Sequence, residues 1–153
     1  MKFTKTLLFL ASIVVLAACG KNDAIDNDSK FECSLDGEQY EAKGLFAYAT
    51  TFTTDNTIAI YGLRNNGDNT IYLSIPNEGQ KKTYQLGLDK DGDGYVVLSK
   101  GTFITTLENG SGEVEVTKVN DKDIEGTFSF TAFDGNGAKV EVSGGEFKVN
   151  IRE

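Results

Sequence analysis

The chain has 153 residues, 23 acidic and 15 basic, with no histidine and no tryptophan. Without histidine there is neither Ser-His-Asp nor Cys-His catalysis, and no imidazole metal site. The formal net charge of −8 argues against nucleic acid as a partner and against holding anionic lipid by charge, because both require clustered Lys and Arg.

The first residues are typical of an export signal. Lys2 and Lys5 precede an apolar run, Leu7 to Leu16. The uncharged stretch is 15 residues, Thr6 to Gly20, whereas a membrane-spanning helix needs roughly 20. We therefore expect residues 1–18 to be a removable signal peptide.

The signal ends in Leu16-Ala17-Ala18-Cys19, which resembles the lipobox of bacterial lipoproteins. That resemblance implies a diacylglycerol on the Cys19 thiol, cleavage between Ala18 and Cys19, and acylation of the new amino group. Two or more acyl chains hold a protein stably on a membrane. After cleavage 13 basic residues face 23 acidic ones, because Lys2 and Lys5 are lost, and the net charge becomes −10.

Residues 19–29 are polar and carry no periodicity, which predicts a flexible tether. Ten such residues reach at most roughly 35 Å. Acidic residues after the lipidated cysteine also resemble signals that send some Gram-negative lipoproteins to the cell surface, although Lys21-Asn22-Asp23 matches them only in part. Both leaflets of the outer membrane are therefore compatible with the anchor.

Period-two alternation begins at Lys30. Phe31, Cys33 and Leu35 alternate with polar residues, and Asp36-Gly37 favours a hairpin. We expect Cys33 to be a buried thiol that behaves as a small hydrophobe. A return strand is expected from Tyr40 through the apolar stretch 45–49.

The middle of the chain predicts two strand pairs. Thr57 to Leu63 and Thr70 to Ile75 flank an Asn-rich turn, and Pro76 ends the second strand. Residues 84–88 and 94–98 are expected to pair around an aspartate-rich turn.

The last third repeats itself. Residues 101–116 and 126–142 both read Gly-Thr-Phe, a glycine-rich turn and Val-Glu-Val, which suggests a duplicated hairpin. The simpler and favoured interpretation is that a strand, a glycine-rich turn and an alternating strand occur in any β-meander. Gly144-Gly145 is expected to turn the chain before a closing strand with Phe147.

About ten short strands predict one all-β domain over residues 30–153, with no significant helix after the signal peptide. We expect an antiparallel meander that forms a β-sandwich or a flattened, lipocalin-like barrel.

Residues 89–94 form the motif with the most specific chemistry in the sequence, a candidate metal site. Asp89, Asp91 and Asp93 have the spacing of the first half of an EF-hand loop, and the Tyr95 carbonyl would be a further calcium ligand. Lys100 stands where the loop requires a bidentate Glu, and strands replace the flanking helices. A weak calcium site and an acidic hairpin turn are both compatible with this pattern.

Two further sets of side chains are candidate functional sites. Acids opposite apolar positions on late strands could serve glycoside hydrolysis, but they are typical of a solvated sheet face: Glu113, Glu115, Glu125, Glu141 and Glu146. Six tyrosines, one per strand or strand end, could line a cavity or a platform, although core filling is the favoured interpretation: Tyr40, Tyr48, Tyr61, Tyr72, Tyr84 and Tyr95.

The C-terminal half, from Gly112-Glu113-Val114 through Gly145-Glu146-Phe147, resembles small Gram-negative lipoproteins that carry an all-β domain of unknown function. The resemblance implies a fold and no catalytic residues. We expect no enzymatic activity and an outer-membrane location through Cys19. The leading hypothesis is a binding module with a small ligand in a sheet-lined cavity. The alternative is an interaction protein that presents a sheet face or edge to an envelope partner.

Overall fold

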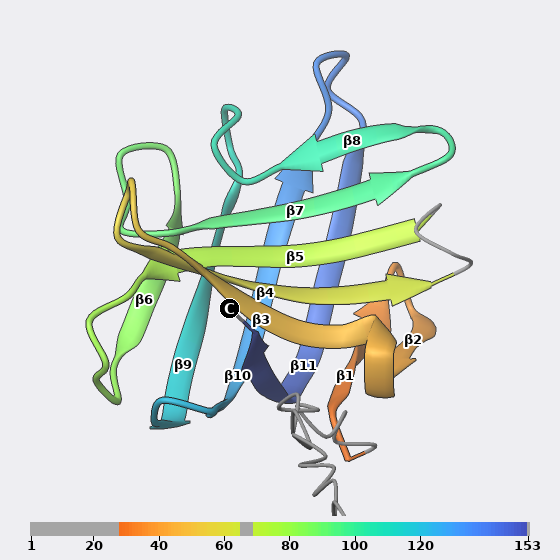
Figure 1. Cartoon of the computed structure of the whole chain (residues 1–153). Coiled ribbons are helices and arrows are strands. Elements are labelled where there is room, and N and C mark those ends of the chain that lie inside the picture. The colour runs from red at the N-terminus through yellow and green to blue at the C-terminus, as the bar shows by residue number, and fades with distance from the viewer. Residues whose placement is uncertain (1–27, 65–68, 153) are drawn as a thin grey trace, which may run out of the picture.

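The computed structural model describes residues 28–64 and 69–152, and Cys19 lies outside this part of the chain (Figure 1). The described residues form a single, mostly antiparallel sheet of 11 strands, which folds into two layers. The only helical segment among them is the three-residue 3-10 turn η1 (Gly44–Phe46). No helix in this part of the chain is long and apolar enough to span a membrane.

One layer has six strands, in the order β2-β1-β11-β10-β9-β6. Their bounds are β1 Lys30–Leu35, β2 Glu38–Lys43, β6 Thr83–Gly87, β9 Ser111–Val119, β10 Asp123–Phe133 and β11 Lys139–Arg152. The other layer has five strands, β3-β4-β5-β7-β8. Their bounds are β3 Ala47–Phe52, β4 Thr57–Arg64, β5 Asn69–Pro76, β7 Asp93–Leu98 and β8 Gly101–Ile104.

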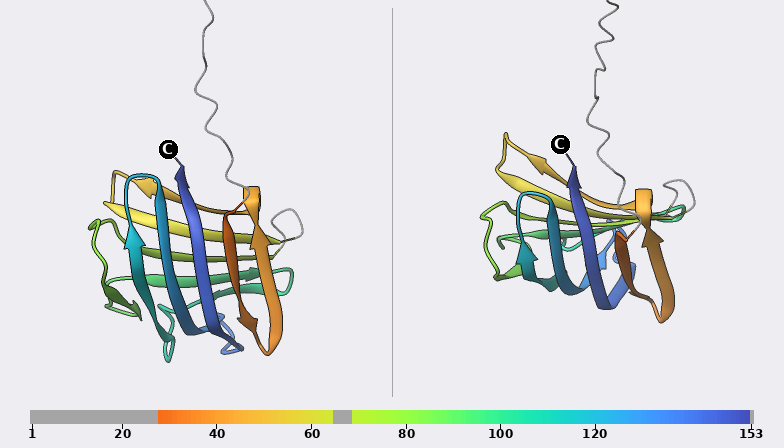
Figure 2. Two further views of the ribbon diagram at one scale, coloured as in Figure 1. Left: turned by 90° about the horizontal axis from the view of Figure 1, so that it is seen from below. Right: turned by 60° about the horizontal axis from the view of Figure 1, so that its bottom comes forward.

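The strands of the two layers cross steeply, as the views from the front and from below show (Figures 1 and 2). Two short seams join the layers. Ile151 and Arg152 of β11 pair in parallel with β3, and Phe133 of β10 pairs with Ile104 of β8. The expectation of an all-β sandwich or flattened barrel is confirmed.

The core between the layers is filled by aromatic and branched side chains. The Phe31 ring lies 4.7 Å from the Phe128 ring, and Phe147 lies 6.2 Å from Phe128. A β-carbon on Gly62 would meet the Phe31 ring at 2.4 Å, so this glycine makes room for the core. The buried Tyr40 hydroxyl donates a hydrogen bond and lies 2.7 Å from the Gly62 carbonyl oxygen.

The Asp36-Gly37 hairpin between β1 and β2 is confirmed, with φ of 51° and 86° at its two turn residues. The expected pair of strands around the aspartate-rich turn is wrong, because β6 pairs with β9 while β7 pairs with β5 and β8. The chain passes from one layer to the other between β6 and β7. Period-two alternation marks which face of a strand is buried but leaves its neighbours undefined.

Two further expectations need correction, and the favoured interpretation of the repeated pattern is confirmed. There is no duplicated hairpin, because β8 and β9 lie in different layers, so the simpler interpretation holds. Gly144 and Gly145 form no turn. They make a bulge inside β11, where the register with β10 and β1 shifts, and the absent β-carbon of Gly145 leaves space for the Phe128 ring. Residues 44–46 leave the sheet as η1, because Gly44 has φ of 58°.

Candidate functional site

The aspartates of the calcium hypothesis are not gathered into a metal site. Asp89 lies in the turn with φ of 57°, whereas Asp93 belongs to β7. No group of three or more His, Cys, Asp or Glu in the described ranges is arranged to hold a metal ion. The Asp93 carboxylate instead bonds to the Tyr95 side chain. Burial raises the pKa of Asp93, and this hydrogen bond opposes the rise. The acidic-turn interpretation fits this geometry.

The late glutamates lie on the outer face of the six-stranded layer. Four of them are exposed, and Glu125 is half-buried with its carboxylate 2.8 Å from the Lys118 ammonium. Two open depressions of about 380 and 280 Å³ lie on this face. Charged side chains make up most of the lining of the larger depression, and three glutamates, Glu113, Glu115 and Glu146, line the smaller one. This is the solvated face that the alternation indicates.

Cys33 is buried, as expected, with 6% of its surface exposed. Burial raises the pKa of its thiol to about 12. The thiol is therefore protonated and enclosed at neutral pH, which agrees with a packing role.

Four of the six tyrosines form one row on the outer face of the five-stranded layer. Strand register places Tyr48 beside Tyr61, Tyr61 beside Tyr72, and Tyr72 beside Tyr95. The ring centroids are 5.0, 5.3 and 4.2 Å apart along this tyrosine row. Core filling is correct only for Tyr40 and Tyr84. For the tyrosines of the row it is wrong.

The rings of the tyrosine row stand on edge. Their planes are tilted by only 21°, 28° and 8° from one neighbour to the next. Parallel rings at these separations cannot lie side by side in one plane, so each ring covers the face of its neighbour. The row consequently presents ring edges to the outside, and the Tyr95 side chain also bonds to Asp93.

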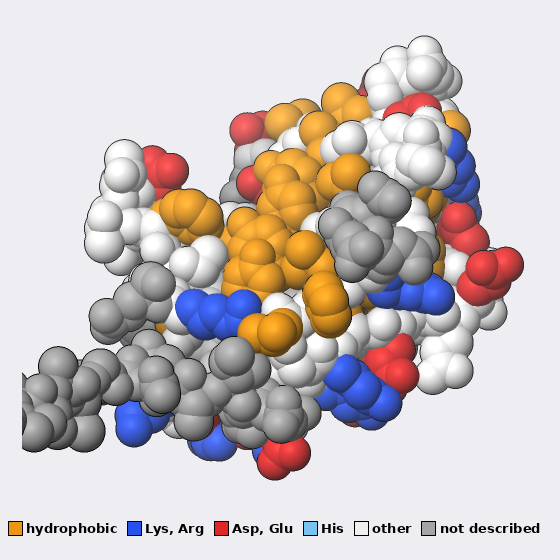
Figure 3. Space-filling view, turned by 45° about the vertical axis from the view of Figure 1, so that its right-hand side comes forward, with side chains coloured by type: hydrophobic (Ala, Val, Ile, Leu, Met, Phe, Trp, Pro, Cys, Tyr) orange, Lys and Arg blue, Asp and Glu red, His pale blue; other side chains and the backbone are white. Residues whose placement is uncertain are grey.

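The rows beside the tyrosine row are neutral except at the ends of one of them, where strand register places Arg152 beside Thr50 and Asp93 beside Ser74. One flanking row contains Thr50, Ala59 and Ser74, and the other contains Leu63 and Val97. Together these outward side chains form the tyrosine face: Tyr48, Thr50, Ala59, Tyr61, Leu63, Tyr72, Ser74, Tyr95, Val97 and Ile104. Figure 3 shows hydrophobic side chains gathered on one face of the molecule, with charged ones around them.

Two charged residues stand at the ends of the tyrosine row. The Arg152 guanidinium carbon lies 4.3 Å from the centre of the Tyr48 ring, a cation–π contact that covers the first ring. Asp93 bonds to Tyr95 at the other end. Burial is the main cause that raises the pKa of Tyr61, Tyr72 and Tyr95, and it raises that of Tyr72 to about 12. These hydroxyls are protonated donors at neutral pH.

A signal for the row was present in the sequence. Ile71, Leu73 and Ile75 share one face of their strand, so Tyr72 must lie on the opposite face, and Tyr61 is flanked in the same way. The alignment of four tyrosines across four strands depends on register, which alternation does not reveal.

Fold and face together define an all-β, sandwich-like domain with a tyrosine-lined outer surface that carries few charges. Residues 27–149 match the family model described as a domain of unknown function, DUF6252, and the chain belongs to that family. No curated protein and no solved structure was found to match the chain.

Proposed function

We propose that this protein is a non-enzymatic, lipid-anchored interaction module, and that its tyrosine face binds a protein partner in the cell envelope. The observation that carries the proposal is the row of four stacked tyrosines on a face whose neighbouring rows carry charge only at the ends, at Asp93 and Arg152. A sheet face normally exposed to water carries charges, as the outer face of the six-stranded layer does. Tyrosine is enriched at protein interfaces because it combines apolar area with a hydroxyl.

The geometry favours a protein surface over a sugar as the partner. A sugar ring stacks on an exposed aromatic face, but neighbouring tyrosines and Arg152 cover the faces within this row. Ring edges and phenol hydroxyls suit a weakly charged surface with carbonyl or hydroxyl acceptors.

The proposal replaces the small-ligand cavity as the leading hypothesis. Large side chains such as Phe31, Phe128 and Phe130 fill the space between the layers. The two open depressions lie on the charged outer face instead. Native mass spectrometry of the mature protein from its own host tests the cavity hypothesis directly, since a bound small molecule would add to the mass.

Site-specific crosslinking in the native host tests the proposed face. A photoreactive amino acid at Ser74, beside the tyrosine row, should give a discrete adduct with one protein. Changing Tyr61 and Tyr72 together to Thr should abolish that adduct. The matched control Glu115→Thr, on the outer face of the other layer, should leave it intact. An adduct that survives the loss of both tyrosines would contradict the proposal, provided that the variant keeps its melting temperature.

The anchor has its own test. Cys19→Ser removes the thiol that the lipobox resemblance assigns to acylation. We expect this variant to leave the membrane fraction, whereas Cys33→Ser should stay there.

A further inference from the structure

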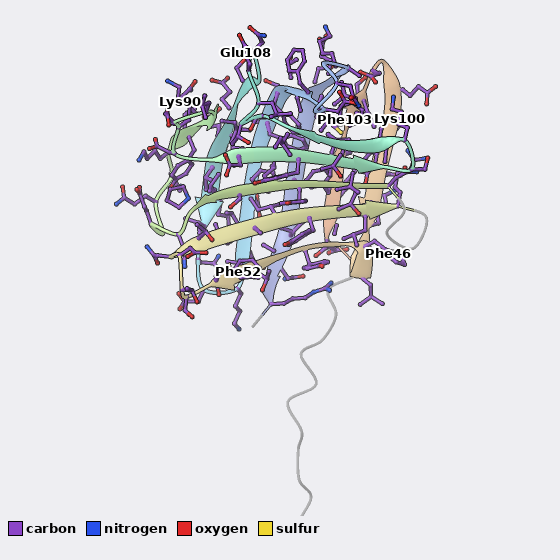
Figure 4. All side chains as sticks on the ribbon, turned by 90° about the horizontal axis from the view of Figure 1, so that it is seen from above. Phe46, Phe52, Lys90, Lys100, Phe103 and Glu108 are labelled. Carbon is purple, nitrogen blue, oxygen red and sulfur yellow. The ribbon has the colours of Figure 1, made fainter. Side chains whose placement is uncertain are left out.

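Three large exposed hydrophobic side chains flank strand β3. Leu45 is 52% exposed, Phe46 47% and Phe52 46%, and together we call them the β3 edge group. Leu45 and Phe46 lie in η1 before the strand, and Phe52 is its last residue. Figure 4 shows Phe46 and Phe52 near the two ends of β3 on one side of the domain.

This side is where the described chain begins. The Gly44 N–H donates to the Ser29 carbonyl oxygen at 2.8 Å, which holds η1 against the start of the domain. Ten residues, 19–28, separate Ser29 from the expected lipid at Cys19. They reach at most roughly 35 Å, so an anchored domain keeps its first strand within that distance of the bilayer and can bring this side to the lipid surface.

The local charge also suits a bilayer surface. Although the sequence has 23 acidic residues, residues 42–54 contain none. Lys43 precedes η1 and forms an ion pair with Glu41 at 2.8 Å, and Arg152 lies beside η1, where it donates to the Leu45 carbonyl oxygen at 3.3 Å. Apolar side chains bordered by cations and a tyrosine are typical of segments that lie in the interface of a membrane.

We infer that the β3 edge group inserts into the interfacial region of the bilayer and fixes the orientation of the anchored domain. The inference rests on the lipid anchor of the proposed function. With β3 at the membrane, the tyrosine row runs from β3 at Tyr48 to β7 at Tyr95, away from the lipid. The partner then meets the tyrosine face beside the membrane.

The test uses the full lipidated protein in vesicles of phosphatidylethanolamine and phosphatidylglycerol. A polarity-sensitive NBD probe is attached to a single new cysteine, made by Phe46→Cys or by Leu88→Cys. Leu88 is the matched control because it is 60% exposed and directly follows β6. Lys90, two residues further along the chain, lies on another side of the domain from Phe46 (Figure 4). Labelling is selective because Cys33 is buried.

We expect the probe at position 46 to emit at shorter wavelength and to be quenched several-fold more by nitroxide-labelled phospholipid than the probe at 88. Changing Leu45 and Phe52 to Ser should reduce this quenching to the control level, whereas Leu88→Ser should leave it unchanged. A probe at 46 that remains water-exposed in protein that floats with the vesicles would overturn the inference. A blue shift without nitroxide quenching would also overturn it, since a protein would then cover the edge.

Failure of the proposed function gives different results. Protein that does not float with the vesicles would refute the anchor itself, and the inference with it. Strong nitroxide quenching of a probe at Ser74 would show that lipid covers the tyrosine face, which would refute the protein-binding role.

Discussion

Thr105 links the end of β8 to β7 through two hydrogen bonds with Gly94. It is fully buried just after β8, and its hydroxyl oxygen accepts a hydrogen bond from the Gly94 N–H at 2.9 Å. Its own N–H donates to the Gly94 carbonyl oxygen at 3.0 Å. A β-carbon on Gly94 would lie 3.1 Å from the Thr105 methyl carbon, so the packing here is tight.

Thr105→Val keeps the shape of the side chain and removes the acceptor. The Gly94 N–H would be left buried without its partner, so we expect the free energy of unfolding to fall by about 1–3 kcal/mol. Thr102→Val, at an exposed position of β8, should change it by no more than about 0.5 kcal/mol. Urea unfolding of both variants measures the difference. Equal stability of the two would refute this role for the hydroxyl.

Cys33 should make stability depend on alkaline pH. Its thiol pKa is about 12 in the folded protein, raised by burial from an ordinary 9.0. As the pH rises above 9.0 the unfolded chain ionises first, so this stabilisation is complete below that pH and is lost toward about 12. We expect the urea midpoint of Cys33→Ala to fall less between pH 8 and 10.5 than that of the unchanged protein. Parallel pH profiles would contradict the assignment, since tyrosine ionisation is common to both proteins.

At the scale of elements, the tyrosine row links four strands by contacts between side chains. The closest pair is Tyr72 and Tyr95, with ring centroids 4.2 Å apart and planes 8° from parallel. Such a pair contributes to the pairing of β5 with β7 in addition to the backbone hydrogen bonds. The row therefore has a structural role even before a partner binds.

A double-mutant cycle on Tyr72→Thr and Tyr95→Thr should give a coupling energy of about 0.5–1.5 kcal/mol. The same cycle on Tyr48 and Tyr95 is the control. Two strands separate this pair, so its coupling should stay within about 0.5 kcal/mol of zero. Chemical denaturation of the single and double variants supplies both values. Equal coupling in the two cycles would show that the rings do not interact as a stacked row.

At the scale of the whole molecule, alternation predicted the β class, the first hairpin and most strands. It also predicted burial of Cys33, because Phe31 and Leu35 share its strand face. The pattern is local, so it could not predict that β6 would pair with β9 or that β11 would reach β3. Those pairings depend on how the two layers pack across the core.

The candidate site was predicted only in part. The outward direction of Tyr72 follows from its buried neighbours Ile71 and Leu73, but the stacking with Tyr61 and Tyr95 needs the register of three strands. The calcium pattern at Asp89 to Asp93 shows the opposite case. There a local motif suggested ligands that the strand geometry of β7 does not bring together.

The position of β1 has a mechanical consequence for an anchored protein. β1 starts at Lys30, directly after the tether, and lies between β2 and β11 with backbone pairing on both sides. In a protein anchored through Cys19 and bound to a partner as proposed above, tension between the two would pull this strand along its own axis. Its hydrogen bonds are perpendicular to the strand, so the load is shared among them all and the bonds rupture together.

Single-molecule pulling would measure this resistance. With the Cys19 thiol of unacylated protein as one handle and a cysteine at Ser74 as the other, we expect a high rupture force. Moving the second handle to Lys43 opens the β1–β2 hairpin from its Lys30–Lys43 end, one pair at a time, and should lower the force. Similar forces in both geometries would contradict the shear arrangement. A domain anchored as proposed would then transmit tension between its partner and the membrane while it stays folded.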